Sequence, residues 1–259
     1  MALRQKRIER NPMEFVDRPR CVPKEVECPE THEFESLLTR IQNARYYAMA
    51  IFLANSACRR GEALALRWAD VNLATGWITV SKSLSETPDG LEVKTTKSGK
   101  TRSVKLSEST IQVLLRHRDQ IEQEKWLCGD SYNDQNLVFP TPVGSHYVPS
   151  QITNRLVAFM KEVGIKSSMH SLRHYNISTL LSRGVPLPVV SKRAGHANPQ
   201  VTLNIYSHVM KGDAEAASVI WENANAEIIA RTQPVAQSRN FASRMCTLVT
   251  SEPAKLRVC

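Results

Sequence analysis

The chain has 259 residues, with 34 Lys or Arg against 25 Asp or Glu, and its formal net charge at pH 7 is +9. A chain of this length can bury a large core, which excludes a peptide or a disordered tail. No apolar run reaches membrane-spanning length, so we expect no membrane partner. The basic excess favours polyanions through counterion release, which makes nucleic acid the leading class of partner and a merely basic surface the alternative.

The start of the sequence lacks the apolar stretch of a secretory signal, and the cysteines are scattered along the chain. They show neither a paired Cys-x-x-Cys spacing nor a matching histidine cluster. We therefore expect free thiols in a cytoplasmic protein, with no metal and no cofactor. The six are Cys21, Cys28, Cys58, Cys128, Cys246 and Cys259.

Residues 1–30 are polar, charged and interrupted by prolines, which predicts an extended linker. A capped amphipathic helix is predicted from Thr31, and its apolar face includes Leu37 and Ile41. A second and more buried helix is predicted over 46–58. These two helices open the folded part of the chain.

Two arginines, Arg59 and Arg60, stand at a break marked by Gly61. A solvated surface position is the common explanation for arginines at such a break. Arg59, however, adjoins apolar helical sequence on both sides, and burying its guanidinium is costly unless the group faces an anion. A phosphate would suit its planar fork, which can bind two oxygens at once.

Beyond this break the apolar residues change to a period of two. Three short antiparallel strands are predicted over 77–80, 91–96 and 101–106. Lys97 opens the turn that joins the last two strands. Most hairpin lysines keep an exposed edge soluble, so Lys97 alone is weak evidence of function.

Helical patterns return in the second half of the chain. One helix carries His170 and Arg173, which lie three residues apart on one face and can address a single ligand, although such a pair is common by chance. A last amphipathic helix is predicted over 214–231, and residues 232–259 show no regular pattern. The helix with His170 and Arg173 is predicted over about 169–181. Three other helices are predicted over 111–127, from a cap at Ser150, and over about 188–193.

The stretch after the Gly195-His196 pair contains a tyrosine in an unusual position. Asn198-Pro199 reads as a helix cap and first residue, which places Tyr206 about two turns into a helix. Val201 and Ile205 lie on the stripe that we expect to face the core. Tyr206 lies one residue off this stripe, so we expect it to look into a cleft, as a nucleophile would, and a packing role is the alternative.

Taken together, four segments resemble, in order and local context, the catalytic domain of the tyrosine recombinases, also called phage integrases. They are Arg59-Arg60-Gly61-Glu62, Thr96-Lys97-Ser98-Gly99-Lys100, His170-Ser171-Leu172-Arg173-His174, and Gly195-His196 with Tyr206-Ser207-His208. The resemblance covers roughly residues 30 to 230. It implies an α+β fold, mostly α, with a small three-stranded antiparallel sheet. The corresponding domains are a linker at 1–30, a catalytic domain at 31–231 and an irregular tail at 232–259.

The resemblance also implies a reaction, the cleavage and rejoining of DNA without metal or cofactor. Tyr206 would attack a phosphodiester and form a 3′-phosphotyrosyl link. Arg59 and Arg173 would neutralise the charge that builds on the phosphorane, and His196 would donate a hydrogen bond to the same oxygens.

Proton transfer would fall to two further residues. By the resemblance, Lys97 would be the general acid for the departing 5′-oxygen, and His170 would assist proton movement at the tyrosine. Supporting roles would fall to Glu62, His174 and His208.

Integrating members of this family usually carry a core-binding domain ahead of the catalytic domain, whereas here only residues 1–30 precede it. Two hypotheses follow. The chain is an active recombinase that works as a homo-oligomer on double-stranded DNA, or it is a truncated and catalytically impaired remnant that binds DNA without recombining it.

Overall fold

The computed structural model describes residues 28–207, except 97, 98, 100 and 167, together with isolated positions nearer the two ends. The chain divides into two compact units, Met1–Lys211 and Gly212–Cys259. In the second unit the described residues lie between 218 and 227 and are helical, inside the helix predicted over 214–231. Most of the predicted linker at 1–30 and all of the predicted tail at 232–259 lie outside the described residues.

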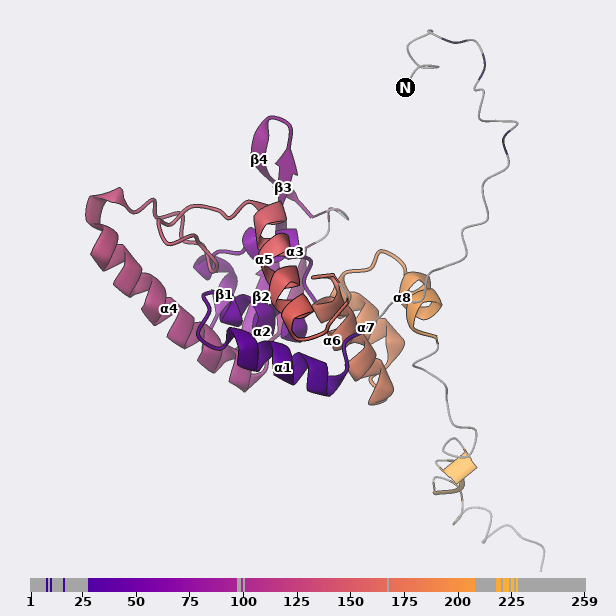
Figure 1. Ribbon diagram of the computed structural model, residues 1–259. Coiled ribbons are helices and arrows are strands. Elements are labelled where there is room, and N and C mark those ends of the chain that lie inside the picture. Colours follow the sequence, from indigo (N-terminus) through magenta and orange to yellow (C-terminus); the bar gives the residue numbers. More distant parts are fainter. Residues whose placement is uncertain are drawn as a thin grey trace, which may run out of the picture. The chain divides into compact units, whose positions relative to one another are not determined.

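The first unit is mostly helical, with two small antiparallel sheets (Figure 1). This matches the predicted fold class. Nowhere in the described part of the chain is a helix both long and apolar enough to cross a membrane. The helices are α1 (Thr31–Ile41), α2 (Tyr47–Ser56), α3 (Arg60–Leu64), α4 (Glu108–Cys128), α5 (Pro149–Glu162), α6 (Ser171–Ser182), α7 (Leu187–Ala194) and α8 (Pro199–Tyr206), with short 3₁₀ turns at Trp68–Asp70 and Gly129–Ser131.

The central helix is α2, because its sequence is apolar on every side. Seven of its ten residues are buried, and it packs against α1, α3, α4 and α6. A helix that is apolar all round is stable only inside a core. It ends at Ala57, which adopts a left-handed conformation (φ 55°) and donates its N–H to the carbonyl of Leu53.

Helix α1 covers the core with one face only. Its buried residues are Leu37 and Ile41, as the amphipathic pattern predicts. Its N-cap is Glu30, whose N–H donates to the Glu33 carboxylate at 2.8 Å. The predicted cap, Thr31, is therefore the first helical residue.

The three-stranded sheet has the order β1 (Val71–Asn72), β2 (Trp77–Val80), β5 (Arg102–Lys105), and all its pairs are antiparallel. Ile78 and Val104 are paired across β2 and β5 and are both buried, so this face of the sheet packs on the core. The strands predicted over 77–80 and 101–106 are its members β2 and β5, whereas β1 was not predicted.

The strand predicted over 91–96 belongs to a separate hairpin, which corrects the sequence analysis. It is β4 (Gly90–Thr95), and it pairs with β3 (Lys82–Thr87), a strand that the sequence analysis missed. β3 is polar apart from the buried Leu84, so it lacks the apolar alternation that marks a half-buried strand. The hairpin projects from the rest of the unit in Figure 1.

The hairpin is attached to the helices at two places. A Cβ added to Gly61 of α3 would lie 2.4 Å from the Leu84 carbonyl oxygen, so helix and strand meet backbone to backbone. At the second place, Ser150 donates from its N–H and its hydroxyl to the Glu86 carboxylate, both at 3.2 Å. Ser150 therefore holds the hairpin and does not cap α5, whose N-cap is Val148.

A smaller apolar cluster joins α6, α7 and α8. It contains Ala57, Ile177, Leu181, Val190, Ala194 and Tyr206. The prediction for α8 was wrong here, because its buried residues are Thr202 and Tyr206, whereas Val201 is 42% exposed. Tyr206 therefore faces this cluster and not an open cleft, since its ring supplies the apolar area that α8 buries.

Candidate active site

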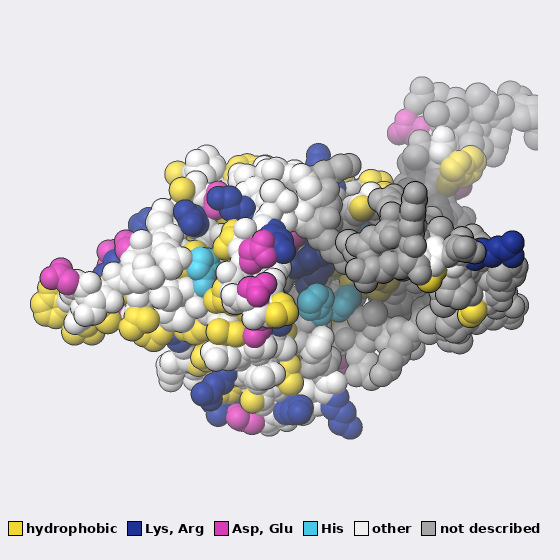
Figure 2. Space-filling view, turned by 90° about the horizontal axis from the view of Figure 1, so that it is seen from above, with side chains coloured by type: hydrophobic (Ala, Val, Ile, Leu, Met, Phe, Trp, Pro, Cys, Tyr) yellow, Lys and Arg dark blue, Asp and Glu magenta, His cyan; other side chains and the backbone are white. Residues whose placement is uncertain are grey.

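Most of the predicted catalytic side chains that the structure describes come from the ends of short elements. Arg59 is the N-cap of α3, His170 is the N-cap of α6 and Arg173 lies in the first turn of α6. Arg59, His170 and Arg173 line one small cavity, together with Arg60. In Figure 2, Lys or Arg and His side chains gather in a hollow in the middle of the face shown.

Arg59 bridges two parts of this site. Its N–H donates to Glu62 Oε2 at 2.8 Å and its Nη1 donates to Glu62 Oε1 at 3.0 Å. Its Nη2 donates to the carbonyl of Gly195 at 3.2 Å, in the turn between α7 and α8. The side chain is still 32% exposed, so part of the guanidinium is available to a ligand.

Arg173 is almost fully buried, with 5% of its surface exposed. Its Nη1 donates to the carbonyl of Ala57, which carries no formal charge. Burial, followed by the nearby charge of Arg59, lowers the pKa of the Arg173 guanidinium to about 10. An anion bound beside Arg59 and Arg173 would relieve this accumulation of positive charge.

The two histidines beside these arginines are held in their neutral form. Burial, then Arg173 and Arg59, lower the pKa of His196 to about 4. Burial, then Arg173 and Arg60, also lower the pKa of His170. His196 Nδ1 is hydrogen-bonded to the Thr202 hydroxyl at 2.7 Å, which fixes the ring. A neutral imidazole fixed in this way can donate one N–H to a phosphate oxygen.

Tyr206 is hydrogen-bonded through its hydroxyl to Nδ1 of His174, and only 1% of the residue is exposed. Burial, opposed by the charge of Arg173, raises the pKa of Tyr206. Burial, then His170 and Arg173, lower the pKa of His174 to about 4. The tyrosine is therefore a protonated phenol beside a neutral imidazole, and the histidine that contacts it is His174, which the sequence analysis named only as a supporting residue.

Arg102 is the residue that the sequence analysis missed. Its Nη1 and Nη2 donate to the two carboxylate oxygens of Glu62, at 3.0 and 2.7 Å. Burial opposes ionisation of this carboxylate, but the hydrogen bonds from Arg102 and Arg59 outweigh it and hold the Glu62 pKa below its usual value. The alternation of side chains along a strand could have indicated that Arg102 faces the core, because Arg102 lies on the same strand face as the buried Val104.

Two predicted site residues, Lys97 and His208, lie outside the described residues. The structure therefore brings together Arg59, His170, Arg173, His196 and Tyr206, with Glu62 and His174 in contact with them.

The family model of the phage integrase family matches residues 30–212, well over half of the chain. The chain belongs to the phage integrase family. It is 27% identical over 201 residues to a tyrosine recombinase XerC-like protein of Caldanaerobacter subterraneus subsp. tengcongensis, which covers 72% of this chain and 51% of that protein. It is 30% identical to the prophage ps2 probable integrase of Lactococcus lactis over 196 residues, a stretch that covers 70% of this chain and 50% of that protein.

Solved integrases and recombinases share the fold of this phage integrase family member. The Tn1549 transposon integrase in complex with a circular intermediate DNA superposes with a TM-score of 0.66 at 20% identity, covering 86% of this chain and 74% of that one. The XerA recombinase superposes with a TM-score of 0.58 at 22% identity, and the match covers 82% of this chain and 67% of that one. The chain spans about half the length of the curated relatives it matches, and both the family and the fold class agree with the sequence analysis.

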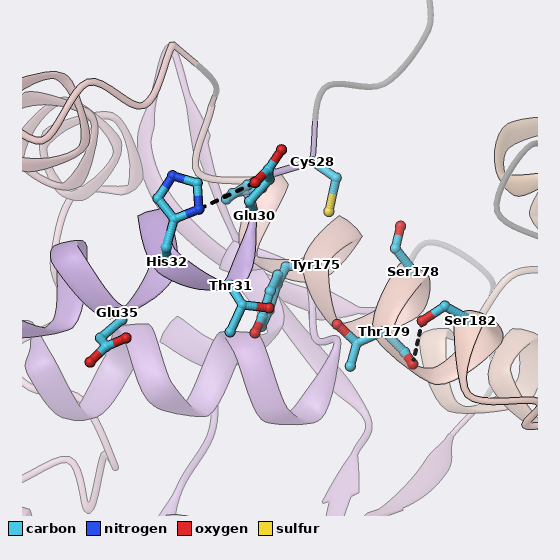
Figure 3. Close-up of a pocket in the computed structure, with 10 residues that line it drawn as sticks. Cys28, Glu30, Thr31, His32, Glu35, Tyr175, Ser178, Thr179 and Ser182 are labelled. Carbon is cyan, nitrogen blue, oxygen red and sulfur yellow. Dashed lines mark hydrogen bonds and ion pairs between the residues drawn. The ribbon is translucent and has the colours of Figure 1, made fainter.

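This integrase-family fold also has an open groove of about 570 Å³ between the segment before α1 and helix α6 (Figure 3). Cys28 and Ser178 point into it, and burial, opposed by a hydrogen bond with Ser178, raises the pKa of the Cys28 thiol. Among the described residues, none of the predicted catalytic ones lines this groove. Within the described residues, no group of three or more His, Cys, Asp or Glu side chains could hold a metal ion.

Proposed function

We propose that this chain cleaves and rejoins double-stranded DNA by metal-independent transesterification and works in site-specific recombination as a homo-oligomer on DNA. The observation that carries the proposal is the convergence of Arg59, Arg173, His170 and His196 beside the Tyr206–His174 pair. Family membership and the DNA complexes among the structural neighbours support the same reaction class.

The electrostatic part of the proposal rests on the two arginines. A phosphodiester bound between Arg59 and Arg173 gains negative charge on its non-bridging oxygens as the phosphorane forms. Guanidinium groups already fixed at that position stabilise the developing charge without reorganisation. His170 and His196 add neutral N–H donors, so the site supplies hydrogen bonds without a further full charge.

The covalent step forms a bond between Tyr206 Oη and phosphorus and breaks the bond from phosphorus to the 5′-oxygen. The phenolic proton passes to His174, which is neutral and already hydrogen-bonded to that hydroxyl. His170, one helical turn before His174, is the second candidate acceptor. The 5′-oxygen takes a proton from Lys97, an assignment that rests on family resemblance alone. Attack by a 5′-hydroxyl of another strand on the phosphotyrosyl link reverses the sequence and rejoins DNA.

The test is covalent capture on DNA of unspecified sequence. The 259-residue chain would be incubated in EDTA at low salt with a library of randomised duplexes, each carrying a nick that traps the cleaved strand. Adducts recovered under denaturing conditions would be sequenced, with Tyr206→Phe as the control. We expect adducts that depend on Tyr206, and the absence of any Tyr206-dependent adduct from the whole library would refute the proposal.

A second candidate is a protein that binds DNA without cleaving it. The observation that favours it is the 1% exposure of Tyr206, which is packed in an apolar cluster. This candidate predicts salt-dependent DNA binding that is the same for the chain and for Tyr206→Phe, with no adduct from either.

A further inference from the structure

Glu62 is the point at which two arginines of the site are joined. Its Oε1 accepts from Arg59 Nη1 and Arg102 Nη1, both at 3.0 Å. Its Oε2 accepts from the Arg59 N–H at 2.8 Å and from Arg102 Nη2 at 2.7 Å. The carboxylate side chain is 1% exposed, so these four donors determine where it lies. Arg59 is therefore held through a carboxylate that Arg102 also holds.

Arg102 has a second contact, with the turn that carries His196. Its Nε donates to the carbonyl of Arg193 at 3.0 Å, near the end of α7. Gly195 follows with a left-handed φ of +68°, and a Cβ added there would lie 2.8 Å from Arg102 Nη1. The guanidinium therefore lies directly against the turn. Arg59 reaches the same turn through the Gly195 carbonyl at 3.2 Å.

Arg102 is poorly placed to bind substrate itself. It is nearly buried, as Arg173 is, so the number of its N–H groups left without a protein acceptor decides whether it can bind substrate. Of the five N–H groups of a guanidinium, four are directed at protein acceptors, which are the Arg193 carbonyl, both Glu62 oxygens and, at 3.7 Å, the Cys58 sulfur. Any effect of Arg102 on the reaction therefore passes through the groups that it holds.

We propose that Arg102 is a positioning residue that fixes Arg59 relative to His196 around the substrate phosphate. The inference rests on the proposed function of this site. The planar fork of Arg102 orients Glu62 and thereby Arg59, while its Nε and its flat face hold the turn before His196. A lysine at this position would keep the charge but would lose the bidentate fork.

The kinetic test compares Arg102→Lys with Arg116→Lys, whose arginine is exposed on α4. Single-turnover cleavage would be measured on a nicked duplex recovered from the library, over a range of DNA concentrations. We expect Arg102→Lys to lower the cleavage rate constant at saturating DNA about 100-fold, because a displacement of a catalytic group by about 1 Å is enough for a loss of that size. The half-saturating DNA concentration should change less than about threefold, and Arg116→Lys should match the unchanged chain.

A purely structural role would give a different result. Arg102→Lys would then lower the melting temperature but leave the rate constant of the folded fraction unchanged. Cleavage by Arg102→Lys at the rate of Arg116→Lys, measured well below both melting temperatures, overturns the inference.

A second measurement keeps the inference testable without any cleavage. The Nε–H resonance of Arg59 can be assigned by its loss in Arg59→Lys and followed by nitrogen-edited NMR of the free chain. We expect Arg102→Lys, but not Arg116→Lys, to shift or broaden it. An unchanged resonance overturns the inference. A shifted resonance in a chain that forms no adduct contradicts the proposed function and supports the positioning role.

Discussion

Glu62→Gln is the substitution whose cost can be worked out most directly from the structure. Each carboxylate oxygen of Glu62 accepts two hydrogen bonds. Whichever way a glutamine amide turns, its NH₂ group would face two donors and could accept from neither. Two hydrogen bonds are therefore lost, and Arg102, 8% exposed, loses its counter-charge.

Removing one partner of a buried ion pair costs about 3–5 kcal/mol. Because the Arg59 side chain is 32% exposed and water can replace part of its contact, we expect the lower end, about 3 kcal/mol. The assay is urea-induced unfolding at pH 7, followed by circular dichroism. A loss of less than about 1 kcal/mol would refute the account of Glu62 as a buried ionised link between two arginines.

The matched control is Glu92→Gln. Glu92 pairs with Lys94 at 2.7 Å on the hairpin, but the two side chains are 51% and 54% exposed. An exposed pair contributes less than about 1 kcal/mol, so this control should unfold almost as the unchanged chain does. Equal losses in both variants would indicate a general effect of charge and not of the buried pair.

Three further predictions concern other parts of the first unit. Burial lowers the pKa of His117 to about 4, so the stability linked to its neutral form is complete above the unfolded pKa of 6.5 and declines as pH falls towards 4. Between pH 7 and pH 5, urea unfolding should show a loss of stability that is about 2 kcal/mol smaller in His117→Gln than in the unchanged chain, because His174 and His196 contribute to the loss in both. Gly195→Ala should destabilise the fold by about 2 kcal/mol, against about 1 kcal/mol for Gly184→Ala, because both have positive φ but only the first methyl meets Arg102; equal losses contradict the contact. Tyr206→Phe should keep its packing and lose about 1 kcal/mol in a thermal melt, since only the bond to His174 is removed; a much larger loss contradicts this contact.

Much of the fold could be predicted because its helices follow strong local patterns. The apolar run of α2, the Leu37–Ile41 stripe of α1 and the Asn198 cap of α8 each fall where the sequence places them, and Asn198 Oδ1 accepts the Gln200 N–H at 2.9 Å. These signals are local, so they can be recognised in the sequence without knowledge of the tertiary contacts.

The errors arose where contacts distant in the sequence decide the structure. The pairing of β3 with β4 depends on docking against Gly61, and β3 is too polar to be recognised as a strand from its sequence alone. The direction of Tyr206 depends on a cluster supplied by α6 and α7, which outweighs the local preference for burying Val201. Arg102 was missed because an isolated arginine in a strand carries no local sign of its partner Glu62, forty residues earlier.

The approach of Gly61 to the Leu84 carbonyl has a mechanical consequence. Because Gly61 has no side chain and faces only the Leu84 backbone and the small Ser83 side chain, α3 and the hairpin are in close contact with little flexible side-chain packing between them. We therefore expect α3 and the hairpin, which projects from the rest of the unit in Figure 1, to move together as one rigid body, and Arg59 is the N-cap of α3. A molecule that binds the β3–β4 hairpin and changes its orientation would therefore also change the position of Arg59.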